Sequence, residues 1–183
     1  MHIPDGFIDL RTSAAFAAVS TVAVAGAVKG ARKQLSEQSA PLAGLTAVFI
    51  FAVQMLNFPV AAGTSGHLIG AALAMVLVGP YAATLALVVV LIIQAFLFAD
   101  GGLTALGLSI FNMAVISVWV SFAVFMLLKK IFPKTKSWLV VATFISALIS
   151  VPAAAVGFVI QYAIGANATF SVGAVLNAMV GTH

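Results

Sequence analysis

Long apolar stretches recur along the whole chain, separated by short segments rich in glycine, proline or charge. Most stretches approach about 20 residues, the length that a helix needs to cross the hydrocarbon core of a bilayer. The expected fold is an all-α integral membrane protein, with a single transmembrane domain over residues 1–183. The pattern predicts about seven spans, six complete and the last truncated, at residues 13–28, 41–57, 65–79, 82–98, 103–128, 138–160 and from 169 onward.

Proline and glycine mark the expected boundaries between these spans. Pro41 is a good first residue of the second helix, and Gly79-Pro80 predicts a tight turn between the third and fourth. Pro152 predicts a kink in the sixth helix. Residues 161–169 are expected to form a polar connection, and the seventh span then stops before it is long enough to cross a bilayer. We therefore expect a truncated last helix.

The first residues predict a turn that folds the chain start back on the protein. Pro4 restricts Ile3 to an extended conformation. Residues Ile3-Pro4-Asp5-Gly6 fit a β-turn with proline at the second position and glycine at the fourth. The N-terminal segment is thus expected to be inserted into the fold rather than to trail from it.

Composition excludes a soluble protein. Hydrophobic residues make up 63% of the chain, charged residues only 7%, and the mean hydropathy is +1.23. A soluble domain carries roughly 25% charged residues. So few charges cannot cover a surface that faces water, which leaves the lipid bilayer as the surroundings of the chain.

Positive charge predicts the orientation in the membrane. The net charge of +4 arises from bases in two short clusters, each joining two apolar spans. Such clusters are typical of cytoplasmic loops, whereas a nucleic-acid-binding protein would present an extended basic face. If both clusters are cytoplasmic, the N-terminus lies on the outer side. The first cluster is Lys29, Arg32 and Lys33, and the second is Lys129, Lys130, Lys134 and Lys136.

Two histidines predicted on the outer side suggest a metal site. The Met1 amine, the His2 amide and His2 Nδ1 can close a five-membered and a six-membered chelate ring around one ion. His67, which follows a glycine-rich stretch, is the candidate fourth ligand. Four nitrogens in a plane favour Ni²⁺ or Cu²⁺, and imidazole also suits Co²⁺ and Zn²⁺. Because metal displaces protons from such ligands, affinity is expected to fall steeply below neutral pH.

Both histidines also have ordinary interpretations. A histidine next to a chain terminus is commonly disordered, and a histidine at a helix start commonly bonds to the backbone. Nearby polar groups are candidates to orient a metal-binding histidine by accepting its other ring proton, with interface solvation and capping as the alternative. These candidates are Asp5, Asn57, Ser65, Asp100, Asn112 and His183.

Catalytic and nucleotide-binding patterns are missing from the sequence. It contains no cysteine, no phosphate-binding G-x-x-x-x-G-K-[ST] loop and no H-E-x-x-H or G-x-S-x-G motif. The spans carry almost no acidic residues for a proton relay. An enzyme, a resident cofactor and a self-powered pump are therefore not expected.

Several motifs together resemble the CbiM/NikM family, the substrate-binding subunits of energy-coupling factor transporters for cobalt and nickel. The resemblance implies seven helices and metal ligation by Met1, His2 and His67. It also implies a transmembrane coupling subunit, two cytoplasmic ATPase subunits and sometimes a small accessory membrane protein, in a bacterial or archaeal plasma membrane. Family members continue beyond the final motif, whereas this chain ends there. The motifs are Met1 to Phe7, and residues 63–70, 90–102, 111–113 and 180–183.

The resulting hypothesis is the metal-binding membrane subunit of an ATP-driven importer for Ni²⁺ or Co²⁺. The planar nitrogen set slightly favours nickel, while cobalt uptake for cobalamin biosynthesis fits the family equally well. The alternatives are a channel or secondary carrier for divalent metals that works alone, and a structural subunit without a ligand.

Overall fold

The computed structural model describes residues 2–36, 39–59, 65–131, 136–167 and 169–182. Within these residues the chain forms six helical segments, one of them a continuous run of α4, η1 and α5, and one short hairpin. The elements are α1 (Leu10–Gln34), α2 (Ala40–Gln54), β1 (Phe58–Pro59), β2 (Ser65–Gly66), α3 (Ala71–Leu97), α4 (Leu106–Ile110), the π-helical η1 (Phe111–Ile116), α5 (Ser117–Ile131), α6 (Lys136–Gly165) and α7 (Val172–Thr182).

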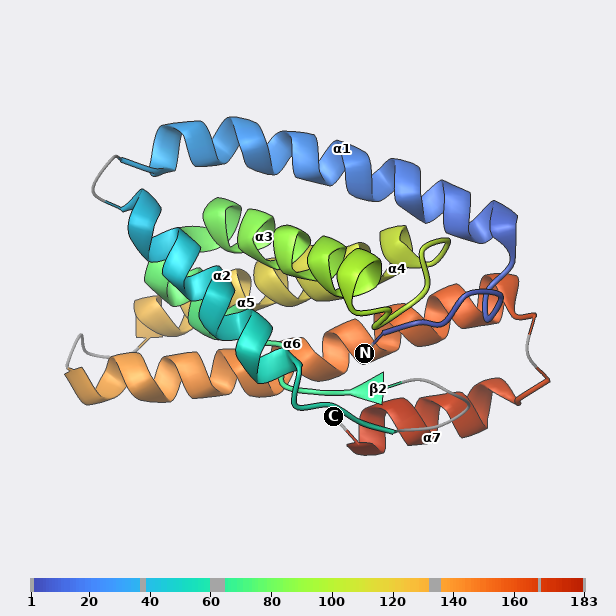
Figure 1. The fold of residues 1–183 in the computed structure, drawn as a ribbon. Coiled ribbons are helices and arrows are strands. Elements are labelled where there is room, and N and C mark those ends of the chain that lie inside the picture. Colours follow the sequence, from blue (N-terminus) through green and yellow to red (C-terminus); the bar gives the residue numbers. More distant parts are fainter. Residues whose placement is uncertain (1, 37–38, 60–64, 132–135, 168, 183) are drawn as a thin grey trace.

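Four of these segments are long and apolar enough to cross a membrane, namely Leu10–Gln34, Ala71–Leu97, Leu106–Ile131 and Ser137–Gly165. α2 and α7 are shorter apolar helices. In Figure 1, α1 and α6 run along opposite sides of the molecule, with α3 and α5 between them. The all-helical, multi-pass membrane architecture expected from the sequence is therefore present, while the count of seven spans stays a prediction.

α3 contains the predicted break at Gly79-Pro80. Gly79 has φ 78° and ψ 166°, which is not helical and joins two helices within one element. Gly79 lies against Gln34 at the end of α1, whereas Ala95, near the end of α3, lines a pocket with His2. Since His67, just before α3, also contacts His2, the chain runs away from the N-terminal segment and then returns to it.

Several predicted boundaries were wrong. α1 continues to Gln34, so Lys29, Arg32 and Lys33 lie in a helix and not in the loop expected after residue 28. Residues 65–70 were expected to start the third helix, but β2 pairs with β1 there, Phe58 opposite Gly66 and Pro59 opposite Ser65, and helix α3 begins only at Ala71. Helix α6 continues to Gly165, so part of the expected polar connection is helical. Apolar neighbours extend the helical pattern through Gln161, whose amide faces inward.

The N-terminal turn is displaced by one residue from its prediction. Phe7 N donates to Pro4 O at 3.3 Å, so the turn is Pro4-Asp5-Gly6-Phe7. Gly6 has φ 77°, a conformation that glycine adopts readily at the third position of a type II turn. The segment then bonds to the end of α6, because Asp9 N donates to Gly165 O at 2.7 Å.

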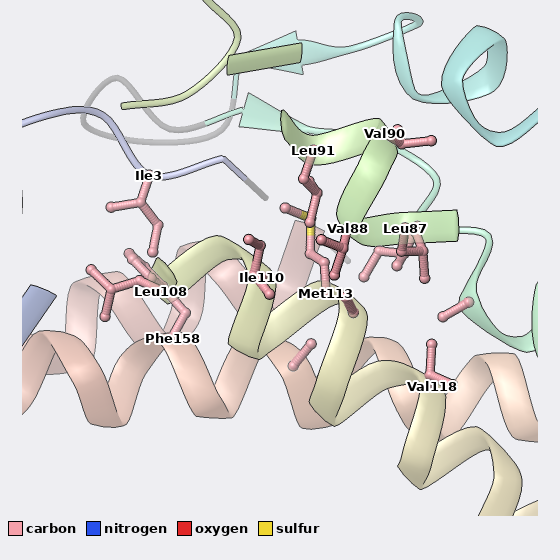
Figure 2. Close-up of a cluster of buried hydrophobic side chains, with 14 of the residues drawn as sticks. Ile3, Leu87, Val88, Val90, Leu91, Leu108, Ile110, Met113, Val118 and Phe158 are labelled. Carbon is pink, nitrogen blue, oxygen red and sulfur yellow. The ribbon is translucent and has the colours of Figure 1, made fainter. Parts of the chain in front are cut away.

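Apolar side chains hold the N-terminal segment in place. Ile3 is 1% exposed and lies in one cluster with Leu108 and Phe158, toward which its side chain points in Figure 2. The Phe7 ring packs against Tyr162 with ring centroids 5.1 Å apart. Fully burying side chains of this size contributes roughly 1.5–3 kcal/mol each, which favours a docked segment over a free terminus.

A reciprocal amide pair joins η1 to α6. Asn112 Nδ2 donates to Gln161 Oε1 at 2.8 Å, and Gln161 Nε2 donates to Asn112 Oδ1 at 3.0 Å. Both side chains are at most 1% exposed. Gly157 makes room for the pair, since a Cβ there would lie 2.9 Å from Asn112 Oδ1. The two side-chain amides thus satisfy each other within the apolar interior.

Candidate metal centre

The two histidines singled out by the sequence meet in the structure. Their ring centroids lie 4.7 Å apart with an angle of 34° between the rings. Each residue is only 4% exposed. His2 comes from the docked N-terminal segment and His67 from the stretch between β2 and α3, so the fold brings together residues that are distant in sequence.

The carboxylate beside His2 belongs to Asp100. His2 Nε2 lies 3.4 Å from Asp100 Oδ2, and Asn57 Nδ2 donates to the same oxygen at 3.1 Å. Burial raises the pKa of Asp100, which the hydrogen bond from Asn57 partly opposes. The carboxylate of Asp100 therefore lies close to His2 Nε2, which has no hydrogen-bond partner among the described residues.

His2 is held in its neutral form. Burial, reinforced by the charges of the terminal amine and of His67, places the pKa of His2 far below its ordinary range. Neutral imidazole is the form that binds metals. Proton competition near neutral pH is therefore not expected from this ring, and the fall in affinity predicted from the sequence would come from the amine and the amide.

The backbone sets the tautomer of His67. Its Nδ1 lies 3.0 Å from the carbonyl oxygen of Leu68. A carbonyl oxygen can only accept, so Nδ1 carries the proton and the lone pair of the ring is on Nε2. Gln54 fixes the following backbone by donating from Nε2 to Ile69 O at 2.8 Å. These contacts fix the His67 ring and the backbone that follows it.

Asp5 acts on the backbone rather than on a histidine. Its carboxylate accepts from Leu103 N at 3.2 Å, from Thr104 N at 2.7 Å and from the Thr104 hydroxyl. These bonds, the Thr104 hydroxyl first, lower the pKa of Asp5. Gly102 N also donates to Ile3 O at 2.8 Å. Together these bonds attach the chain just after His2 to residues 102–104.

Two glycines allow this close approach. A Cβ on Gly101, which has φ 99°, would lie 3.2 Å from His2 Nδ1, and a Cβ on Gly102 would collide with Asp5 N and Oδ1. A pocket of about 470 Å³ opens beside these residues and is lined by His2, Asp5 and Asp100 among others. Residues 101 and 102 therefore must be small for the N-terminal segment to dock.

Gly102→Ala is expected to destabilise the protein by about 1–3 kcal/mol, because the added methyl group must displace the Asp5 backbone. Gly44→Ala is the matched control. Gly44 is an exposed helix residue with no atom within 4 Å of its added Cβ, so this change is expected to be neutral or stabilising by up to about 1 kcal/mol. Denaturant unfolding in detergent measures both, and equal stabilities would refute the proposed docking role of Gly102.

The remaining candidate residues divide into three groups. Asn112 pairs with Gln161 and so makes its amide contacts away from the histidines. Ser65 lies in β2 opposite Pro59, and only its backbone is described. Met1 and His183 lie outside the described residues.

Sequence reasoning missed three residues that shape the site. Thr104 binds Asp5, Gln54 fixes the chain after His67, and Gly102 faces the Asp5 backbone. From the sequence, Asp100 was a candidate, and Gly101 and Gly102 were included only as the end of the motif at residues 90–102, although two successive glycines are also a signal for close backbone approach. Within the described residues, no three histidine, cysteine, aspartate or glutamate side chains gather around one point. The candidate side-chain ligands in this part of the chain are therefore the two imidazoles of His2 and His67.

Comparison with known proteins gives consistent matches. The family described as CbiM, the cobalt uptake substrate-specific transmembrane region, matches residues 2–183. A protein of Haloquadratum walsbyi that is named for metal transport is 38% identical over all of this chain and 81% of its own length. The fused nickel transport protein NikMN of Rhodobacter capsulatus is 41% identical over 69% of this chain, which spans 37% of that longer protein.

The fold has a solved counterpart as well. A crystal structure described as a truncated transition metal transporter superimposes with a TM-score of 0.90 at 31% identity, covering 100% of this chain and 89% of that one. The match covers the helices as well as the segments that carry His2 and His67. Sequence and structure together establish that this chain is a multi-pass membrane protein belonging to the CbiM family of cobalt and nickel transport proteins.

Proposed function

We propose that this chain captures Ni²⁺ or Co²⁺ as cargo and is the metal-binding membrane subunit of an importer of the energy-coupling factor type. The observation that carries the proposal is the buried pair of His2 and His67, whose rings lie 4.7 Å apart. Neutral imidazole is a good ligand for both metals.

In the proposed site, four nitrogens surround one ion. The Met1 amine, the His2 amide and His2 Nδ1 form the two fused chelate rings, and His67 Nε2 completes the plane. Asp100 orients the His2 ring, and the Leu68 carbonyl sets the His67 tautomer. The planar set slightly favours nickel, because Ni²⁺ promotes deprotonation of an amide more readily than Co²⁺.

The chain contributes binding and passage, while its partners supply energy. A transmembrane coupling subunit and two cytoplasmic ATPases, sometimes joined by a small accessory membrane protein, would drive release of the metal to the inside. The basic residues near the ends of α1 and α5 favour a cytoplasmic location for those ends, which supports an outer location for the N-terminal segment and its histidines.

Calorimetric titration of the purified protein with a native N-terminus tests the proposal. Ni²⁺ and then Co²⁺ are added in buffers of different ionisation enthalpy, so that released protons are counted. We expect 1:1 binding with proton release, because the amine and the amide must lose protons to bind. Binding of neither metal would refute metal capture by this chain.

Metal uptake into proteoliposomes separates the proposal from a channel or carrier that works alone. With this chain as the only protein, we expect no uptake above that of empty vesicles. Rapid uptake down a metal gradient would show that this chain is a channel and not an importer subunit, even if the calorimetric result were positive.

A further inference from the structure

A basic hollow lies at the opposite end of α1 from the histidines. It has a volume of about 410 Å³ and is lined by Gly26, Lys29, Gly30, Lys33, Gln34 and Tyr81. At a rise of 1.5 Å per residue, it sits roughly 30 Å along α1 from the N-terminal segment. None of these residues takes part in the proposed metal site.

Two glycines one turn apart and an aromatic ring form the floor of the hollow. The Tyr81 ring lies directly on the backbone of Gly30, where a Cβ would collide with it. Gly26, on the same face of α1, has nothing within 4 Å of the position of a Cβ, so space remains open above its backbone. Trp119 packs edge-on against Tyr81 at 5.1 Å and fixes the ring.

Positive charge borders this floor. Lys29 and Lys33 are one helical turn apart and therefore lie on the same side of α1. The Gln34 side chain fills the place of the missing Cβ of Gly79 and adds an amide to the lining. Among the described residues, the lining contains no carboxylate, so no acidic side chain from that part of the chain lies beside the two ammonium groups in the hollow.

We propose that this hollow binds the headgroup of an anionic phospholipid, with Lys29 and Lys33 on the phosphate and the first acyl carbons over Gly26 and Tyr81. α1 is long and apolar enough to cross a membrane, so its basic end lies at the lipid–water boundary. Lysines and tyrosine are suited to that depth, since each combines an apolar stem or ring with a polar end. Basic pockets between membrane helices are known to select such headgroups.

Native mass spectrometry of the purified protein tests this site with two lipids of identical acyl chains, phosphatidylglycerol and phosphatidylcholine. We expect the wild type to prefer phosphatidylglycerol by roughly tenfold or more, because each lysine near a membrane surface favours anionic lipid. The double change Lys29→Gln and Lys33→Gln should remove the preference. Gly26→Leu should do the same without altering charge, because the leucine fills the hollow.

The control is the double change Lys129→Gln and Lys130→Gln, which removes the same charge from the end of α5, outside the hollow. It should retain the lipid preference. If both lysine pairs lower the preference equally, diffuse surface charge explains it and the site is refuted. A wild type without headgroup preference refutes it too, leaving the lysines to complement the helix dipole or to contact a protein partner. Displacement of the lipid by excess inorganic phosphate would show a site for the free ion instead.

Discussion

One additional residue in front of Met1 is expected to weaken Ni²⁺ and Co²⁺ binding by at least about 100-fold, because losing direct ligands costs more than losing the groups that orient them. The extension moves the amine out of the chelate and leaves every side chain unchanged. Calorimetric titration of the extended and native proteins measures the difference. The result separates a chelate that uses the terminal amine from a site formed by side chains alone.

Folding of the extended protein has to be checked in parallel. Contacts that do not involve the terminal amine dock the segment, among them the buried side chain of Ile3 and the bond from Gly102 N to Ile3 O. The unfolding midpoint without metal is therefore expected to match that of the native protein. Unchanged metal affinity in a protein of unchanged stability would exclude the amine as a ligand and, with it, the proposed planar geometry.

His67→Ala is expected to reduce metal affinity by about 100-fold or more, since it removes one of the four ligands directly. Leu68→Ala is the matched control, because Leu68 is the next residue, is 72% exposed and offers its backbone rather than its side chain to the site. Isothermal titration of the two variants with the same metal provides the comparison. Equal losses would mean that the local backbone, and not the imidazole, determines binding.

A second readout distinguishes ligation from packing. Ni²⁺ in a planar set of four nitrogens has a characteristic d–d absorption band, and this band should disappear in His67→Ala at saturating metal. A band that persists unchanged would assign the fourth position to another ligand and refute the role of His67 proposed here.

Much of the fold could be predicted because few kinds of secondary structure can span a lipid bilayer. Apolar runs of sufficient length must form helices, and the residues that interrupt those runs, such as Gly79 and Pro80, mark where the chain turns. The predicted start of the third helix, at residue 65, was too early for a local reason. The short strands at residues 58–59 and 65–66 pair with each other, and two-residue pairing leaves no periodicity to detect.

The site was harder to derive than the fold. His2 and His67 were identifiable because few side chains in this sequence bind metals, but their mutual approach depends on contacts between distant segments. Asp5 and Asp100 illustrate the limit. Both were candidates to orient a histidine, and only the tertiary structure assigns Asp100 to His2 and Asp5 to Thr104. Two carboxylates near one histidine in space cannot be ranked by their position in the sequence.

The paired amides of Asn112 and Gln161 restrict how this protein can change over generations. Replacing either residue alone leaves the other amide without a partner in an apolar interior, which lowers the free energy of unfolding by about 1–3 kcal/mol. Replacing both with apolar groups of similar shape can be nearly neutral. A lineage that starts from this pair must cross an unfavourable intermediate to lose it. The bond between η1 and α6 is therefore expected to be inherited as a unit, even where the surrounding apolar residues drift freely.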